Sequence, residues 1–220
     1  QSLMVPNEDL QAESSLNLDV STQCRLDRFA KMYLTLGAFW QRPEKLILLQ
    51  PNSQLTYKAI NVGSARIHGA ELLAIMKHKF LRAQLGYTWL MAIDTSSQLG
   101  VQGQRLPSAP EHQIYTRLRL GGETVNAEYE ASFTTLSYLD RANLRPNPAR
   151  LLQNLYAKWQ SSDSQWTVTL SVRNLADVQS QPVLLRGADT PSPAKLSDFL
   201  GYPLSGRSFE LQVHYTMRAS

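Results

Sequence analysis

The residues whose chemistry best suits ligand binding lie in two polar segments in the second half of the chain. Guanidinium groups bind oxyanions and aromatic faces cover apolar surface, so these segments could contact an anionic chelate. Ordinary solvated loops of the same composition are the alternative interpretation. The candidate contact residues are Tyr138, Arg141, Asn143 and Arg145 in the first segment and Arg186 and Asp189 in the second.

No spacing of residues in the sequence predicts a catalytic, cofactor or metal site. The four histidines, His68, His78, His112 and His214, are dispersed and lack the spacing of a metal motif. The single cysteine, Cys24, excludes an internal disulfide framework and a cysteine-rich metal site. Phosphate-cradling glycine loops, nucleophile elbows and paired-carboxylate motifs are also absent from the sequence. We therefore expect a protein that is not an enzyme and that has no cofactor.

The composition excludes two further classes of protein. The 220 residues include 22 Lys and Arg against 18 Asp and Glu, and this net charge of +4 is too small to indicate a nucleic-acid partner. The longest uncharged stretch, residues 46–57, is broken by Pro51, whereas a membrane-spanning helix needs about 20 apolar residues. The sequence therefore does not predict a helical membrane protein.

Two-residue alternation of apolar and polar side chains is the dominant pattern in the chain. Trp166, Val168, Leu170 and Val172, for example, are separated by single polar residues. Such alternation indicates strands with two chemically different faces. The pattern predicts an all-β protein with nine antiparallel strands at approximately 10–22, 28–41, 64–78, 80–95, 112–120, 123–138, 151–160, 165–175 and 207–217.

The connections between these strands alternate strictly in length. Short turns are expected at 23–27, near His78, at Gly121-Gly122 and at 161–165, and long polar connections at 42–63, 96–111, 139–150 and 176–206. Outer-membrane barrels have short periplasmic turns and long extracellular loops. The lengths therefore predict a transmembrane up-and-down β-barrel wall.

Aromatic residues mark both ends of the predicted apolar face. Counting along the strands puts Trp159, Trp166 and Tyr215 near the short-turn rim, and Trp40 and Trp89 near the opposite rim. Two such girdles are typical of barrels at the membrane interfaces, although the same residues could form the core of a soluble β-domain. On the polar face, Arg117 and Arg119 are expected within reach of Glu128 and Glu130, as in a polar lumen.

Four strings of residues, in order, resemble the β-barrel of TonB-dependent outer-membrane receptors. They are NVGSARIHGAE from Asn61, QRLPSAPEH from Gln104, LSVRNLAD from Leu170 and GYPLSGRSFELQVHY from Gly201. The resemblance implies that residues 1–220 are the C-terminal part of a larger, 22-stranded barrel in the bacterial outer membrane. It further implies uptake of a scarce nutrient, such as an iron chelate or cobalamin, with energy passed through TonB.

An odd number of strands cannot close as an ordinary bacterial barrel, and an open edge in lipid leaves backbone groups unpaired. We therefore expect lipid, the remaining barrel strands and a plug as partners, the last two supplied by an upstream segment of the same polypeptide or by a second chain. Two other interpretations stay open. One is a structural or assembly barrel that derives from a receptor and has lost transport, as one chain of a complex. The other is a soluble β-rich adhesin module.

Overall fold

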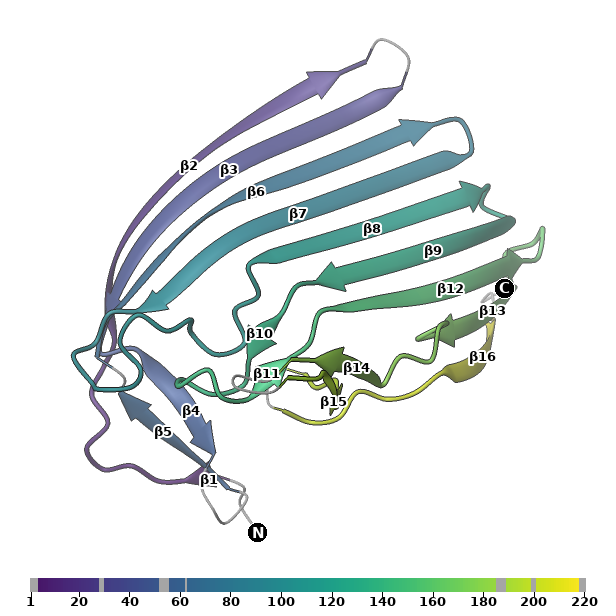
Figure 1. The fold of residues 1–220 in the computed structure, drawn as a ribbon. Helices are drawn as coiled ribbons and strands as arrows, with labels where there is room; N and C mark the ends of the chain where they lie inside the picture. Colours follow the sequence, from purple (N-terminus) through teal and green to yellow (C-terminus); the bar gives the residue numbers. More distant parts are fainter. Residues whose placement is uncertain are drawn as a thin grey trace.

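A computed structural model describes residues 4–27, 30–51, 56–61, 63–184, 189–198 and 201–217. Nine long strands form one antiparallel sheet in the order β16-β13-β12-β9-β8-β7-β6-β3-β2, so each strand pairs only with its neighbours in sequence (Figure 1). These strands are β2 (Ser14–Leu26), β3 (Lys31–Glu44), β6 (Ala65–His78), β7 (Leu81–Asp94), β8 (His112–Gly121), β9 (Val125–Thr134), β12 (Arg150–Gln160), β13 (Trp166–Arg173) and β16 (Ser208–Tyr215). The predicted all-β class and nine-stranded sheet are confirmed.

Within the described ranges there is no helix of the length and apolarity needed to cross a membrane.

All short turns lie at one end of the sheet, and the long connections gather at the other (Figure 1). Three of these connections contain strands that the sequence interpretation missed. They form small sheets from β4 (Ile47–Pro51) and β5 (Tyr57–Asn61), from β10 (Ser137–Tyr138) and β11 (Pro146–Asn147), and from β14 (Ser180–Val183) and β15 (Ser192–Lys195). A further short strand, β1 (Met4–Val5), precedes β2 and adds to the first of these sheets by pairing with β5. The predicted asymmetry of connections is thus correct, but the long ones are structured.

The prediction was wrong for two strands. The first strand was expected at 10–22 followed by a turn at 23–27, but β2 continues to Leu26, where Leu26 pairs with Met32. The alternation continues through Cys24 and Leu26, and the polar residues Gln23 and Arg25 occupy the polar face rather than a turn. The strand expected at 123–138 ends at Thr134, because the chain there leaves the sheet to form β10.

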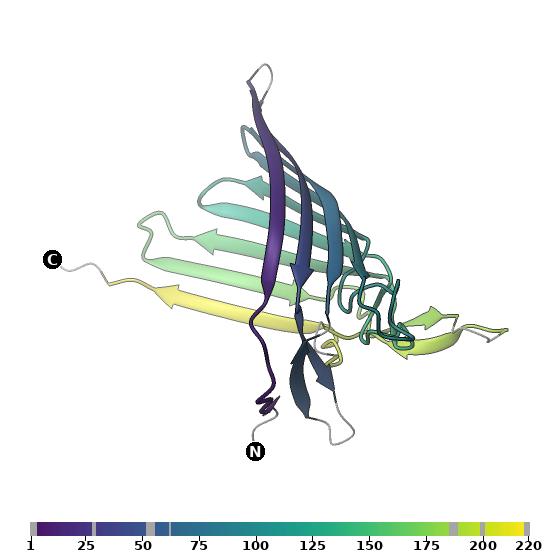
Figure 2. The same ribbon diagram turned by 90° about the vertical axis from the view of Figure 1, so that its left-hand side faces the viewer.

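Exposure on the two faces of the sheet is the reverse of that in a soluble protein. Leu170 is 47% exposed while its neighbour Ser171 is 5% exposed, and Val125 is 59% exposed beside Asn126 at 7%. The sheet is curved (Figure 2), and side chains crowd together on the concave side of a curved sheet but spread apart on the convex side. The polar face is therefore concave and the apolar face is the convex outer surface.

The apolar face extends without interruption across all nine strands. Cross-strand registers align Leu211 with Leu170, and Leu36 with Leu72, at opposite ends of the sheet. Exposed apolar side chains on this face include Leu16, Leu18, Val20, Leu36, Leu85, Ile114, Leu118, Leu120, Leu151, Leu155, Leu170, Phe209, Leu211 and Val213. An apolar surface of this extent in a soluble monomer would exceed the few hundred Å² normally tolerated.

A small buried core lies at the long-connection end. Ala65, Ala92 and Leu106 are buried together, and Leu46 and Ala109 pack against them. This contact holds the 96–111 connection against β6 and β7, so the segment has a fixed position over the end of the sheet. The candidate ligand residues near residue 140 are placed against this same connection.

Candidate functional site

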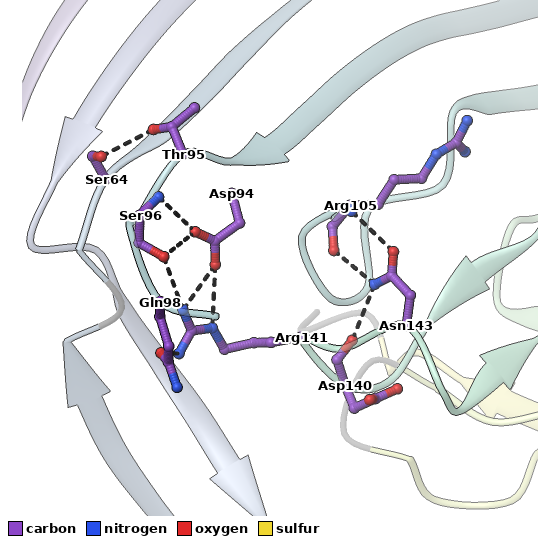
Figure 3. A network of polar contacts seen from close by, with 9 residues as sticks. All are labelled: Ser64, Asp94, Thr95, Ser96, Gln98, Arg105, Asp140, Arg141 and Asn143. Atoms are coloured by element: carbon purple, nitrogen blue, oxygen red, sulfur yellow. Dashed lines mark hydrogen bonds and ion pairs between the residues drawn. The ribbon is translucent and has the colours of Figure 1, made fainter. Parts of the chain in front are cut away.

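Arg141 joins two of the long connections through a buried ion pair (Figure 3). Its Nη2 lies 2.8 Å from Oδ2 of Asp94, which ends β7 and is 1% exposed. The Nη1 group donates to Oε1 of Gln98 at 2.9 Å, and the backbone amide of Ser96 donates to Oδ1 of Asp94 at 2.9 Å. The Asp94 carboxylate is thus satisfied on both oxygens. Arg141 therefore fixes the 139–149 connection to the 95–111 connection.

Asn143 strengthens the same junction, because its side-chain amide pairs with the backbone of Arg105 as a neighbouring strand would (Figure 3). Its Oδ1 accepts the backbone amide of Arg105 at 2.9 Å, and its Nδ2 donates to the Arg105 carbonyl, also at 2.9 Å. Asn143 has φ of 56°, a left-handed conformation that asparagine tolerates better than most residues. The two sequence-predicted residues Arg141 and Asn143 are therefore brought together, as parts of a loop-to-loop clamp.

The other predicted contact residues occupy more open positions. Tyr138 is half-buried in β10, and its carbonyl accepts the Ser108 amide at 2.7 Å. Arg145 is exposed, and Asp189 is exposed near the tip of the β14–β15 hairpin at the same end of the sheet. Arg186 lies outside the described residues. Ligand contact by this set stays a prediction.

A polar cluster that the sequence indicated only in part lies on the concave face. Glu130 of β9 accepts hydrogen bonds from the hydroxyls of Tyr115 and Tyr156, at 2.9 and 3.1 Å, and from Nε of Arg117 at 2.9 Å. The Asn154 amide approaches the second carboxylate oxygen at 3.5 Å. One carboxylate therefore links β8, β9 and β12.

Arg117 also lies 3.2 Å from Oε1 of Glu128, so the expected pairing of arginines and glutamates across β8 and β9 is confirmed for this residue. The sequence interpretation missed Tyr115 and Tyr156. Both occupy positions that alternate with the apolar residues of their strands, so the two-residue pattern could have placed them on the polar face. No group of three metal-ligating His, Cys, Asp or Glu side chains occurs in the described part of the chain.

At the short-turn rim, aromatic rings cluster on the apolar face. Trp166 and Tyr215 are directly paired across β13 and β16, with ring centroids 4.7 Å apart. Trp159 precedes the next turn on β12, where it pairs with Val168 and Val125. The three aromatics thus lie on neighbouring strands at one level, as the sequence predicted, and their role as a membrane girdle stays a prediction.

At the opposite rim, histidines accompany the tryptophans. Trp40 is paired with His68, whose ring meets Trp89 edge-on at 5.7 Å. His112 stacks on Tyr87 with centroids 6.1 Å apart, and its Nδ1 lies 2.9 Å from the Tyr87 hydroxyl. Two of the histidines that looked dispersed in the sequence are therefore neighbours of this aromatic band.

Two of the family-like strings, LSVRNLAD and GYPLSGRSFELQVHY, contact each other through hydrogen bonds. The Asn174 amide donates to the carbonyls of Val178 and Ser205, at 3.1 and 3.0 Å. Asp177 accepts the backbone amide of Arg207 at 2.7 Å, and this hydrogen bond is the main reason that the pKa of Asp177 lies below its ordinary value. The Asn-Leu-x-Asp and Gly-Arg strings therefore form one junction, which fixes where the chain enters β16.

The first two strings also make defined structural contacts. The Asn61 amide donates to the carbonyl of Gln11 at 2.9 Å, and accepts the Gln11 amide at 2.8 Å. Gly69 lies directly opposite Phe39, whose ring covers it, and an added Cβ would lie 2.6 Å from the ring. In the second string, the hydrogen bond and charge of Arg105 lower the pKa of Glu111.

The architecture is that of a wall segment of a transmembrane β-barrel. It combines an apolar convex face, a polar concave face, rims of aromatic residues, and turns sorted by length to the two ends. The sequence profile described as "TonB dependent receptor-like, beta-barrel" matches residues 1–175. The chain belongs to this family of TonB-dependent receptors.

Solved structures agree on the fold. The ferric yersiniabactin uptake receptor FyuA from Yersinia pestis is 15% identical with a TM-score of 0.69, over 92% of this chain and 30% of FyuA. The copper transporter OprC is 16% identical with a TM-score of 0.67, over 96% of this chain and 32% of its own. The FrpB iron transporter from Neisseria meningitidis is 16% identical with a TM-score of 0.61, over 97% and 33% of the two chains.

The chain thus spans about a third of the length of these structures. No curated protein matches the sequence.

Proposed function

We propose that the chain forms nine adjoining strands of a TonB-dependent receptor barrel in a bacterial outer membrane. The apolar face contacts lipid, the polar face lines the lumen, and the long connections face the cell exterior. The observation that carries this proposal is the reversed exposure of the two faces, since a sheet with a wet concave face and an apolar convex face suits lipid outside and water inside.

In this proposal the edge strands β2 and β16 pair with strands that lie outside residues 1–220. Both are edges of the nine-stranded sheet, and unpaired backbone groups in hydrocarbon cost several kcal/mol each. A complete barrel, with a plug in its lumen that contacts TonB, would import a scarce nutrient such as an iron chelate or cobalamin. The similar structures named as iron and copper transporters support a metal-containing cargo, without identifying it.

The loop-to-loop clamp formed by Arg141 and Asn143 supports the transport proposal. Arg141 and Asn143 use their polar groups to hold two connections together, so the exposed Arg145 is better available to the anionic groups of a cargo, and the exposed Asp189 to its hydrogen-bond donors. A rigid loop junction loses little conformational freedom when a ligand binds, which favours affinity. The role proposed for the clamp is positioning, and the role proposed for the exposed residues is contact.

Cysteine labelling on intact cells tests the topology. In the full receptor with Cys24 replaced by Ser, a cysteine at Leu99, which is 98% exposed, or at Asp189 should react with a membrane-impermeant maleimide. A cysteine at Asp163, in the β12–β13 turn, should react only after the outer membrane is permeabilised. Labelling of all three sites on intact cells would refute the membrane topology, and the reverse pattern would invert it.

Uptake measurements then test transport. Cells that lack the receptor should lose energised uptake of one labelled ferric chelate or of cobalamin, and an uncoupler should abolish that uptake in the parent strain. Correct topology without any uncoupler-sensitive uptake would instead support the structural or assembly barrel.

A further inference from the structure

A row of four positive side chains crosses the polar face near the short-turn end. The register places Lys31 directly opposite Lys77, Lys77 opposite Arg82, and Arg82 opposite Arg119. These residues come from the four adjacent strands β3, β6, β7 and β8. Directly opposed side chains have Cβ atoms about 4.5–5.5 Å apart, and like charges at that distance destabilise a sheet. Three consecutive unfavourable pairs therefore require compensation.

The acidic residues at the two ends of this cationic row supply little of that compensation. Asp27, beyond Lys31, forms its ion pair with Arg25 at 2.7 Å. Glu128 lies opposite Arg119 in the register, but its carboxylate contacts Arg117. Among the residues that the structure describes, no member of the cationic row forms an ion pair within 4 Å.

Two hollows run along the cationic row and leave it accessible. One, of about 450 Å³, is lined by Lys31, Lys77, Lys79 and Arg82 together with Asp27, Ala30 and His78. The other, of about 340 Å³, is lined by Lys77, Arg82 and Arg119, and also by Arg117 and Glu128. Positive groups outnumber negative ones in both hollows, so both favour an anionic occupant.

The length of the cationic row decides between kinds of occupant. Neighbouring strands lie about 4.8 Å apart, so four strands place the outer two charges roughly 14 Å apart. A small anion can contact two of these charges at once. An extended peptide repeats its side chains on one face every 6.6–6.8 Å or so, and carboxylates at three alternate positions cover about 13 Å. An extended acidic segment therefore matches the whole row.

We propose that the cationic row is the docking site for an extended acidic protein segment held inside the barrel near its short-turn end. The inference rests on the proposed function, because it takes the concave face to be the lumen. Each carboxylate of the segment replaces a repulsive cross-strand pair with attraction on both sides. The compensation that the isolated wall lacks would then come from the chain that fills the lumen.

Carbodiimide cross-linking of the full receptor in its native membrane tests this docking. The reagent joins a lysine amine to a carboxylate in direct contact, so peptides containing Lys31 or Lys77 should be recovered linked to Asp or Glu outside residues 1–220. Lys195 and Lys45, exposed at the opposite end, are matched controls and should give no link to the same acidic segment. Links confined to acidic residues within this chain would overturn the proposal.

Substitutions separate charge from reagent chemistry. Lys77→Arg keeps the charge but removes the amine, so the Lys77 link should vanish while the Lys31 link remains. Arg82→Gln with Arg119→Gln keeps both lysines reactive but removes two ion pairs, and should lower the link yield roughly two- to thirty-fold. Salt at 1 M, where the Debye length is about 3 Å, should lower it in the wild type too.

An unchanged yield in the double variant would overturn the proposal. Failure of the proposed function is distinguishable, because it would appear in the labelling of Leu99, Asp189 and Asp163. Correct labelling without these cross-links refutes only the docking of an acidic segment.

Discussion

Replacing Leu170 with arginine should damage the barrel far more than replacing its neighbour Thr169. Leu170 lies in the middle of β13 on the apolar face, between Ala157 and Leu211. An arginine at the midplane of the lipid face of a barrel costs roughly 2–4 kcal/mol. The cost arises because the guanidinium must distort the bilayer or bend away to reach water.

The same substitution at Thr169 has a different environment. Thr169 lies on the polar face, with Lys158 opposite on one side and Gln212 on the other. An arginine there stays in water but meets a like charge, which costs roughly 0.2–1 kcal/mol. The difference between the two variants is therefore about 1–4 kcal/mol, which corresponds to a factor of roughly 5 to 10³ in the folded population.

The measurement is urea unfolding of the full receptor in lipid vesicles, with heat-modifiable gel migration as the readout of assembly in cells. Leu170→Ala serves as the control for loss of the side chain without a charge. Equal midpoints for Leu170→Arg and Thr169→Arg, or a lower midpoint for Thr169→Arg, would show that the assignment of lipid and lumen faces is incorrect.

The remaining predictions concern particular contacts. Gly69→Ala should destabilise assembly by about 1–3 kcal/mol, because its Cβ would collide with the backbone carbonyl of Trp89 and the ring of Phe39. The matched control Gly86→Ala, also within a strand, gains only an ordinary 3.8 Å contact. Equal unfolding midpoints for the two variants would contradict this prediction. Arg141→Gln leaves the buried Asp94 carboxylate without its cationic partner and should destabilise the 95–111 connection by up to about 3–5 kcal/mol. The loss is measured as faster hydrogen exchange in that connection, and adding Asp94→Asn should recover much of it. Unchanged exchange in the single variant would refute the clamp. The pKa of Asp177 is lowered by folding, so its stabilisation is present above the unfolded-state pKa and is lost as pH falls through the folded-state value. The Arg207 amide that donates to Asp177 should therefore lose protection against hydrogen exchange in acid, measured against its intrinsic exchange rate at each pH. Asp177→Asn should remove this pH dependence, and unchanged protection of the wild-type amide in acid would contradict the linkage.

The strand pattern could be predicted because alternation and turn length are local properties of the sequence. Trp166 to Val172 and the Gly121-Gly122 turn needed no knowledge of distant residues. The strands of the long connections could not be found in this way. β10 and β11 have two residues each, and their pairing depends on where Ser137 and Asn147 meet.

The candidate site shows the same limit more clearly. The types of Arg141 and Asn143 suggested ligand contact, because an arginine and an asparagine in a polar loop have spare hydrogen-bonding groups. Their partners, Asp94 and the backbone of Arg105, are 47 and 38 residues away in sequence. Only the packing of the 95–111 connection over β6 and β7 brings these partners close, and no local pattern encodes that packing.

The nine long strands have the same order in the sheet as in the chain. This order determines how such a protein can change its size. Every long strand pairs with its sequence neighbours, so no connection crosses over another strand. Deleting β8 and β9 together would leave the end of β7 and the start of β12 at the same rim, antiparallel and joinable by one outer loop. Barrels with this topology can therefore gain or lose strands in hairpin pairs during evolution, and the circumference changes in discrete steps without rethreading the chain.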